Sequence, residues 1–408
     1  MSKLNVMYFT FGETPRLDGV YESQVISLLE NTKQYNNIHL YSVIPFVNSG
    51  FYKSGFKYLR LLTDIAKRLS NSDVKFNYSF SAGPQNLFYS SKYGFNFFHN
   101  YSKKKLLNYI QVNNIHVVHC RSYHSAFEAI KLRAKFGLEY KVVFDPRGLW
   151  PEESCIKKKN NFKDEGYKDL KKIESYILKN ANVTICLSIP MIKHYKALGA
   201  LNCELVYASS KVINDKQESK YCEVTFCYIG ALNEDGWHSP EELFKVFSSI
   251  KKVKKDAKLL IISPTKKDQI LKAAKSQYLS DITIVAAKNS VEVLTLASKC
   301  HIGLLPFRIP KSAPEKMVGE TMVGTKTLEY IASNMIIFAN KYSGGARDLI
   351  EENNLGRSYD PENITQDDIV NLLTMEPNSQ GKAFVNNLFS DEFNAKRYSE
   401  IYSSIENR

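Results

Sequence analysis

Short apolar runs alternate with amphipathic segments along the whole chain, and both have the lengths of ordinary strands and helices. The apolar runs, which predict buried strands, are Asn5–Thr10, Ile38–Pro45, Ile115–Cys120, Lys141–Phe144, Val183–Ser188, Glu204–Ala208, Val224–Gly230, Lys258–Ser263, Ile282–Ala286, His301–Phe307 and Met335–Ala339. Apolar residues recur at helical spacing in Glu22–Leu29, Phe51–Leu69, Leu170–Lys179, Pro190–Leu198, Glu242–Val253, Gln269–Ala274, Val291–Ala297 and Ala346–Glu352. Strands that alternate with helices predict an α/β protein built on parallel sheets.

The alternation continues on both sides of one polar segment. The 408 residues exceed the size of one ordinary core, so two domains are expected. We predict an N-terminal Rossmann-like domain at 1–208, a linker at 209–220, a C-terminal Rossmann-like domain at 221–390 and a final helix at 391–408. That final helix has one apolar face, formed by Phe393, Tyr398, Ile401 and Tyr402.

The segment from Gly303 to Asn340 combines a buried strand, a polar loop, an amphipathic helix and a second strand. In such units, ligands bind beyond the carboxyl ends of the strands. Lys326 and Glu329 stand at the start of the helix, three residues apart and so on one face. Free N–H groups, the helix dipole and a lysine all attract phosphate, while a carboxylate one turn further along can hold sugar or ribose hydroxyls. The alternative is a surface ion pair between Lys326 and Glu329.

Charged residues also follow two strands in the first half of the chain. His119 and Arg121 lie at the end of one strand, and Asp145 and Arg147 follow the next. In a doubly wound sheet, such ends form the ligand site. The planar, permanently charged guanidinium suits phosphate or carboxylate, which makes Arg121 and Arg147 candidates for binding such groups. The alternative is a buried arginine–Asp145 pair.

A basic amphipathic segment occupies residues 51–69. Its cations are Lys53, Lys57, Arg60, Lys67 and Arg68. A helix of this kind can lie on an anionic membrane surface. Equally, its apolar face can pack on the protein core while the basic face is solvated.

The formal net charge of +13 indicates an anionic partner. No nucleic-acid-binding motif is present, so we expect no nucleic acid partner. The seven cysteines include no C-x-x-C pair, which argues for a reducing compartment and against zinc. With no apolar run of about 18 residues and no signal-peptide pattern, we expect a cytoplasmic protein. The inner face of the cytoplasmic membrane is a candidate surface for peripheral binding.

Three segments resemble family 4 glycosyltransferases, and in particular the branch that builds bacterial surface polysaccharides. They are VVHCRSYHSA (117–126), VFDPRGLWPEE (143–153) and TKTLEYIASNMII (325–337). The shorter SQV (23–25) and YIG (228–230) segments fit the same pattern, so the likeness extends over most of the chain.

The resemblance implies the GT-B fold, in which two Rossmann-like domains face each other across a cleft and the C-terminal helix packs back on the N-terminal domain. It implies retaining, metal-independent sugar transfer from a nucleotide-sugar donor to a lipid-linked or oligosaccharide acceptor, without a cofactor. Glu329 corresponds to the residue that binds ribose, Lys326 lies near the phosphates, and Gly230 faces the diphosphate. The implied donor site comprises Gly230, Ala287, Lys288, Thr325, Lys326, Thr327 and Glu329, and the implied catalytic residues are His119, Arg121 and Arg147.

The chain departs from the family pattern at several positions. The family's earlier glutamate falls on Thr321, with Glu320 beside it, and a histidine of the family is replaced by Arg121. The family's proline and second glycine are Gly324 and Asn334. Two alternatives stay open: a catalytically silent GT-B-fold binding partner, and a GT-B nucleotide-sugar epimerase.

Overall fold

The computed structural model describes residues 3–45, 51–81, 96–158, 165–209, 218–233, 236–274, 276–377 and 380–407. Most of the predicted linker at 209–220 lies outside the described residues, which exclude 210–217. Contacts within the chain define two compact units. Unit 1 comprises Met1–Leu187, Ile192–Ser209 and Asp391–Arg408, and unit 2 comprises Ser188–Met191 and Ser210–Ser390.

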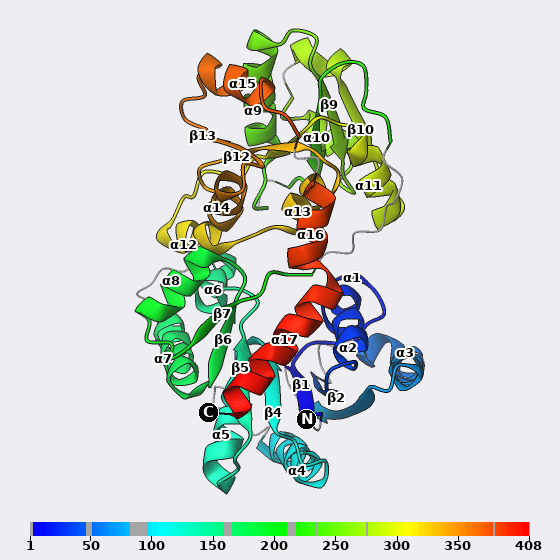
Figure 1. Ribbon diagram of the computed structural model, residues 1–408, viewed down its shortest axis with the longest axis vertical. Helices are drawn as coiled ribbons and strands as arrows, with labels where there is room; N and C mark the ends of the chain where they lie inside the picture. The colour runs from blue at the N-terminus through cyan, green and yellow to red at the C-terminus, as the bar shows by residue number, and fades with distance from the viewer. Residues whose placement is uncertain are drawn as a thin grey trace. The chain divides into compact units, whose positions relative to one another are not determined.

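Unit 1 contains a seven-stranded parallel sheet in the order β3-β2-β1-β4-β5-β6-β7 (Figure 1). The strands are β1 (Asn5–Phe11), β2 (Asn37–Pro45), β3 (Lys75–Ser81), β4 (Val117–Arg121), β5 (Lys141–Asp145), β6 (Val183–Cys186) and β7 (Cys203–Leu205). The order of strand addition reverses between β1 and β4. Ligands of doubly wound sheets bind at the carboxyl ends beside such a reversal.

The helices described before the linker are α1 (Gly19–Tyr21), a π-helical turn (Glu22–Ile26), α2 (Ser27–Thr32), α3 (Phe51–Asn71), α4 (Asn96–Val112), α5 (Ser122–Phe136), α6 (Trp150–Lys158), α7 (Glu165–Asn180) and α8 (Ile189–Ala197). The first three form one continuous helical segment between β1 and β2. Its buried residues, which include Val25 and Ile26, contribute to the core of unit 1.

The C-terminal helix α17 (Asp391–Glu406) belongs to unit 1 and lies beside α2 (Figure 1). Its apolar face completes the core of this unit with Ala395, Tyr398, Ile401, Tyr402 and Ile405. Polar contacts hold the start and the middle of this helix. Ser27 Oγ donates to Asp391 Oδ2 at 2.7 Å, and Arg397 pairs with Glu204 at 2.7 Å.

Unit 2 contains a six-stranded parallel sheet in the order β10-β9-β8-β11-β12-β13. The strands are β8 (Thr225–Ile229), β9 (Lys258–Ile262), β10 (Ile282–Val285), β11 (Ile302–Leu305), β12 (Ile336–Asn340) and β13 (Gly356–Tyr359). The helices described are α9 (Pro240–Val253), α10 (Lys267–Leu271), a 3₁₀ helix (Ser276–Asp281), α11 (Ser290–Ser298), α12 (Ala313–Thr321), α13 (Thr325–Ala332), α14 (Gly344–Glu352), α15 (Gln366–Leu373) and α16 (Gly381–Phe389). Here the order reverses between β8 and β11.

The predicted α/β class with parallel sheets is confirmed, but the sequence prediction missed several elements, among them helices α4, α5, α6 and α12 and strands β3 and β13. The loop expected after Phe307 contains helix α12, which begins where Ser312 Oγ accepts from the Glu315 N–H. Ser312, Pro314 and Glu315 form a helix-start pattern that the analysis of apolar spacing overlooked. The edge strands β3 and β13 were also missed, because the aromatic residues of β3 are only partly buried and β13 is mostly polar.

The predicted basic segment forms α3, and its apolar residues pack inward. Tyr58, Leu62, Ile65 and Leu69 are buried, and Arg68 is paired with Glu22 and Glu30. The side chain of Lys53 lies outside the described residues. The buried face of α3 is therefore used by the protein itself, as the core-packing alternative requires. Within the described ranges, every helix is too short or too polar to cross a membrane.

Candidate functional site

In unit 2, the candidate site forms where α13 begins at the carboxyl edge of the sheet. Lys326 Nζ donates to the Tyr228 hydroxyl at 3.0 Å and lies 4.7 Å from the centre of that ring. Gly230 follows β8 with a φ of 117°, a conformation that favours glycine. A Cβ atom at Gly230 would stand only 3.1 Å from Lys326 Nζ. The glycine thus leaves space beside the ammonium group.

Tyr330 fixes the position of α13 relative to two strand ends. Its buried hydroxyl donates to the Leu304 carbonyl at 3.1 Å and accepts from the Ile229 N–H at 3.0 Å. Its ring lies against Gly303, where a Cβ would overlap the ring. The absence of a side chain at Gly303 is therefore what allows this anchor to form.

Both charged groups at the start of α13 are partly buried. Burial lowers the pKa of Lys326 to about 8, although the nearby Glu329 opposes this change. Burial likewise raises the pKa of Glu329, which Lys326 opposes. Among the described residues, the two groups do not approach closely enough for a direct ion pair, so the alternative of a surface ion pair is not realised. Their charges remain available to a ligand.

The other predicted donor residues have different environments. Thr327 is fully buried, and its Oγ1 has no hydrogen-bond partner among the described residues. Thr325 is exposed. Lys288 is exposed and follows β10 together with Ala287, but the Lys288 N–H donates to Glu292 Oε2 at 2.7 Å. The structure therefore already uses the main-chain N–H of one residue of the implied donor site.

Thr321 occupies the position of the family's earlier glutamate, and neither it nor the adjacent Glu320 provides a buried carboxylate. Thr321 is buried, and its hydroxyl donates to backbone carbonyls within α12. Glu320 is exposed and lies 3.8 Å from Lys316. Neither residue therefore supplies a buried carboxylate near α13.

His238 joins the same region, although the sequence analysis did not select it. It is buried, with its ring centre 4.3 Å from that of Phe307 and 5.7 Å from that of Tyr228. Burial and the charge of Lys326 hold its pKa well below the usual value, so the imidazole is neutral. Its only signal in the sequence was its place in the loop after the YIG strand.

In unit 1, the two predicted arginines lie together beyond β4 and β5. Arg121 Nε donates to both Glu13 oxygens, at 2.9 and 3.1 Å. Arg147 donates to Gln24 Oε1 at 2.6 Å and to Asp145 Oδ2 at 3.4 Å. The pairing with Asp145 that the sequence analysis held open thus involves Arg147, whereas Arg121 takes a carboxylate from the loop after β1.

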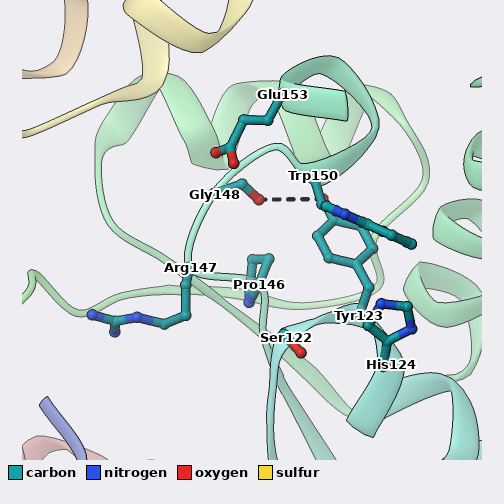
Figure 2. Close-up of a pocket in the computed structure, with 8 residues that line it drawn as sticks. All are labelled: Ser122, Tyr123, His124, Pro146, Arg147, Gly148, Trp150 and Glu153. Atoms are coloured by element: carbon teal, nitrogen blue, oxygen red, sulfur yellow. Dashed lines mark hydrogen bonds between the residues drawn. The ribbon is translucent and has the colours of Figure 1, made fainter. Parts of the chain in front are cut away.

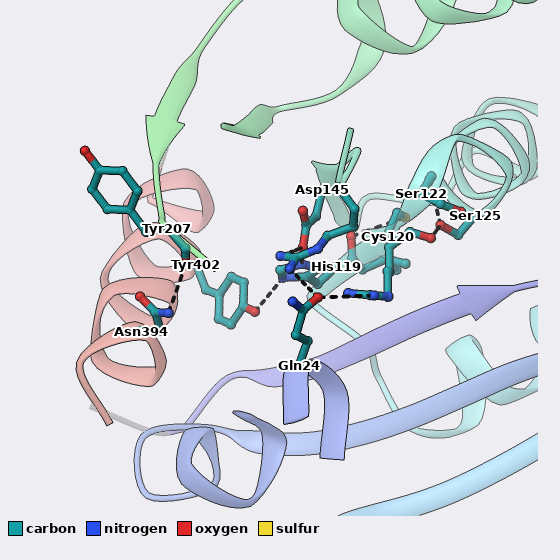
Figure 3. A network of polar contacts seen from close by, with 12 residues as sticks. Gln24, His119, Cys120, Ser122, Ser125, Asp145, Tyr207, Asn394 and Tyr402 are labelled. Carbon is teal, nitrogen blue, oxygen red and sulfur yellow. Dashed lines mark hydrogen bonds and ion pairs between the residues drawn. The ribbon is translucent and has the colours of Figure 1, made fainter. Parts of the chain in front are cut away.

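His119 lies beneath these arginines and is fully buried. Its Nδ1 is 2.7 Å from the Tyr402 hydroxyl, and its Nε2 is 3.4 Å from Asp145 Oδ2 (Figure 3). Burial lowers the pKa of His119. Burial alone would raise the pKa of Asp145, but Arg147 and the hydrogen bond with His119 outweigh it and lower that pKa to about 2. A neutral His119 therefore donates from Nε2 to Asp145 and accepts from Tyr402 at Nδ1.

A cavity of about 140 Å³ lies next to this cluster, also within unit 1 (Figure 2). Its lining includes Ser122, His124, Trp150 and Glu153, together with the Pro146–Gly148 turn. Figure 2 shows the Arg147 side chain extending away from Trp150 and Glu153. Burial raises the pKa of Glu153, and it lowers that of His124 to about 3.

A buried polar network supports the floor of this cavity. The hydroxyls of Tyr123 and Tyr195 lie 3.3 and 3.2 Å from the Gly148 carbonyl oxygen and 2.7 Å from each other. The Tyr123 hydroxyl is also 2.9 Å from Glu174, which pairs with Lys171. Each hydroxyl has one proton to donate, so Tyr123 can donate to Glu174 while Tyr195 donates to the Gly148 carbonyl. The two buried tyrosines therefore fix the position of the turn that carries Gly148.

The described part of the chain contains no group of three or more histidine, cysteine, aspartate or glutamate residues placed to bind a metal ion.

Comparisons with known proteins connect this geometry to a fold. No protein-family model matches the chain, and no curated protein does. Solved structures do match. A glycosyltransferase from Rickettsia africae ESF-5 is similar over 99% of this chain and 99% of its own, with 16% identity and a TM-score of 0.65. The lipopolysaccharide outer core galactosyltransferase WaaB, in its apo form, matches 98% of this chain and 100% of its own, with 14% identity and a TM-score of 0.64.

HepE from Anabaena, solved in complex with UDP, is similar over 98% of this chain and 100% of its own, with 11% identity and a TM-score of 0.65. At such low identities the likeness shows the fold alone. The chain has the GT-B fold of these glycosyltransferases, as the sequence analysis predicted.

Replacing Tyr402 by Phe should destabilise the protein by about 1–3 kcal/mol, because His119 Nδ1 would lose its partner in a buried site. Urea denaturation followed by circular dichroism measures the change. Tyr398→Phe is the matched control on the same helix face, since that ring contacts His119 edge-on without a hydrogen bond to it among the described residues. Equal stability of the Tyr402→Phe variant and the parent protein would contradict the assigned role of the hydroxyl.

Proposed function

We propose that the chain is a glycosyltransferase that moves a sugar from a nucleotide-sugar donor to a lipid-linked or oligosaccharide acceptor in bacterial surface polysaccharide synthesis. The proposal includes family 4 membership, retention of configuration at the sugar and independence from metal ions. The observation that carries it is the ammonium of Lys326, held at the start of α13 beside the space left by Gly230. The HepE structures with UDP and UDP-glucose make a uridine diphosphate sugar the first donor to test.

The chemistry of this arrangement suits a diphosphate. The first N–H groups of α13 and the ammonium of Lys326 concentrate positive charge at one point, where phosphate oxygens are stabilised. Glu329, one turn further along α13, would accept hydrogen bonds from ribose hydroxyls. We assign Lys326 and Glu329 to the donor, and the edge of unit 1 at Arg121 and Arg147 to the acceptor side.

Two other functions are compatible with the same fold. The absence of a buried carboxylate at Glu320 or Thr321 supports a catalytically silent binding partner. A nucleotide-sugar epimerase would use the donor alone. Incubating the purified chain with UDP-glucose separates these cases: released glucose supports the transferase, an epimerised donor supports the epimerase, and an unchanged but bound donor supports the silent partner.

Substitution of Lys326 and of Glu329 should weaken donor binding in different ways. Each substitution would remove a hydrogen bond to the donor in which at least one member is charged, worth about 1.5–3 kcal/mol, or about ten- to hundredfold in affinity. Lys326→Ala should weaken UDP and UDP-glucose but leave uridine nearly unaffected. Glu329→Ala should weaken uridine as well, because its partner is the ribose. Calorimetry with the three ligands provides the comparison, and parent-like binding of all three by both folded variants would refute the donor site.

The pH dependence of UDP binding should report Lys326 directly. Its pKa of about 8 in the free protein means that the ammonium loses its proton as the pH rises through 8. A bound diphosphate favours the charged form, so UDP affinity should change little between about pH 7 and 7.5 and fall by up to about tenfold per pH unit above 8. The phosphate itself titrates near pH 6 and does not interfere. Lys326→Arg, which stays charged, should remove the dependence. A flat calorimetric profile between pH 7 and pH 9 for the parent protein would exclude contact between Lys326 and phosphate.

We also propose that the exposed basic residues of α3 attract the protein to anionic membranes, where a lipid-linked acceptor resides. Lys57, Arg60 and Lys67 are exposed, and each cation near such a surface contributes about 1 kcal/mol. The protein should co-sediment with anionic vesicles at low salt and be released at high salt, and replacing all three residues by Gln should abolish binding. The control variant replaces the exposed Lys266, Lys267 and Lys272 of unit 2 by Gln, an equal change of charge. Equal binding by the two triple variants would disprove the role of α3.

A further inference from the structure

The cavity of unit 1 beside Trp150 has features that the donor site does not explain. We propose that it is a subsite for one neutral sugar ring, with Trp150 as its packing surface and Glu153 as the acceptor of its hydroxyl hydrogen bonds. The proposal deepens the proposed function, because the ring would be the part of the acceptor that receives the new sugar. The binding site itself can be tested without that assumption.

The size of the cavity fits one six-membered ring. Its volume is about 140 Å³. An apolar protein cavity of about 150 Å³ holds one benzene molecule, which is also a six-membered ring. The site is partly open, so substituents of a pyranose can extend outward. A longer oligosaccharide would place only one of its rings in the cavity.

The aromatic wall suits the apolar face of a sugar. Trp150 packs against His124 with ring centres 4.5 Å apart, and against Tyr123 with centres 5.6 Å apart. These contacts fix the indole in one orientation while it remains partly exposed to the cavity. Ligand sites of this type combine a rigid aromatic surface with a few polar groups that set orientation.

The polar groups of the cavity can bind hydroxyls. The carboxylate of Glu153 lies directly over Gly148, where a Cβ would overlap its oxygen, so only glycine permits this position. Ser122 Oγ is shielded from solvent and has no hydrogen-bond partner among the described residues. A carboxylate accepts two hydroxyl hydrogen bonds, and a serine hydroxyl can donate as well as accept.

The charges around the cavity favour a neutral ligand over a phosphate. The Arg147 guanidinium is directed to Gln24 and Asp145 instead of the cavity (Figure 2). His124 is neutral at physiological pH, so it offers no positive charge. Among the described residues that line the cavity, Arg147 is the only cation and it points away (Figure 2), so an anion would meet the carboxylate of Glu153. Lys157, whose charge acts on Glu153, does not line the cavity.

Backbone strain is concentrated at this cavity. Six residues other than glycine have positive φ among those described, and four of them are Asp or Asn, which tolerate this conformation. The other two are Ser122 at 75° and Arg147 at 62°, and both line the cavity. Strained backbone of this kind persists at binding sites because the surrounding structure holds it there.

The two tryptophans of the chain allow a direct test, because Trp237→Phe leaves Trp150 as the sole indole reporter. This variant is titrated with methyl glycosides of glucose, galactose, N-acetylglucosamine and rhamnose, and with inorganic phosphate. We expect a saturable change of Trp150 emission at millimolar concentrations of at least one glycoside, and none with phosphate. Calorimetry with the same ligands runs in parallel.

Glu153→Gln in the same background should weaken the responding glycoside by about ten- to hundredfold, because a hydrogen bond to a charged group is lost. Glu165→Gln, at an exposed glutamate of α7, is the matched control and should bind like the parent. Circular dichroism verifies that each variant is folded.

The proposal would be overturned if no glycoside binds, if a glycoside binds by calorimetry without changing Trp150 emission, or if Glu153→Gln binds as tightly as the control. Tighter binding of phosphate than of every glycoside would overturn the neutral specificity and with it the proposal. Calorimetry of UDP with the unmodified chain distinguishes failure of the proposed function from failure of the sugar subsite. Loss of UDP binding alone defeats the proposed function, and loss of glycoside binding alone defeats only the sugar subsite.

Discussion

The hydroxyl of Tyr330 links the ends of two neighbouring strands, and the candidate donor site depends on that link. One oxygen satisfies the last N–H of β8 and a carbonyl of β11, in a position that water cannot reach. Because Lys326 precedes Tyr330 by one helical turn, fixing the tyrosine also fixes the side of the sheet on which the ammonium stands. Two glycines make room for these side chains: Gly303 lies against the Tyr330 ring, and Gly230 lies beside Lys326 Nζ. The first admits the ring, and the second keeps the space beside the ammonium open.

The two candidate sites differ in whether their cations are already paired with carboxylates. In unit 2, Lys326 has a neutral phenol as its hydrogen-bond partner and is poorly solvated, so an arriving anion improves its environment. In unit 1, Glu13 and Asp145 already neutralise Arg121 and Arg147. Removing one member of a buried pair leaves the other charge uncompensated, which typically costs about 3–5 kcal/mol. The arginines therefore shape the edge of unit 1 as part of a connected structure, and the cavity beside them retains the Ser122 hydroxyl without a hydrogen-bond partner among the described residues.

The sequence predicted the parallel strands and the start of α13 well, because both follow from local apolar patterns. It could not predict which carboxylate Arg121 would select, since Glu13 lies 108 residues earlier and no local pattern joins them. His119 was chosen for its place at a strand end, but its ring points toward Tyr402, at the far end of the chain. The cavity beside Trp150 escaped detection for a similar reason. Ser122 and Glu153 meet there only because the backbone turns through positive φ at Ser122 and Arg147, and neither residue type signals that turn.

The return of α17 to unit 1 has a consequence for how the protein is made. The buried residues of α17, among them Tyr402 and Ile401, complete a core whose remaining residues precede Ser209, so the first unit to emerge from the ribosome lacks part of its interior. All of Ser210–Ser390 must be translated before the missing helix appears, which takes on the order of ten to forty seconds at typical elongation rates. During that interval the groove later filled by α17 exposes apolar side chains of α2 and β1. Unit 2, whose core is contiguous apart from four residues, can fold first even though it is synthesised second.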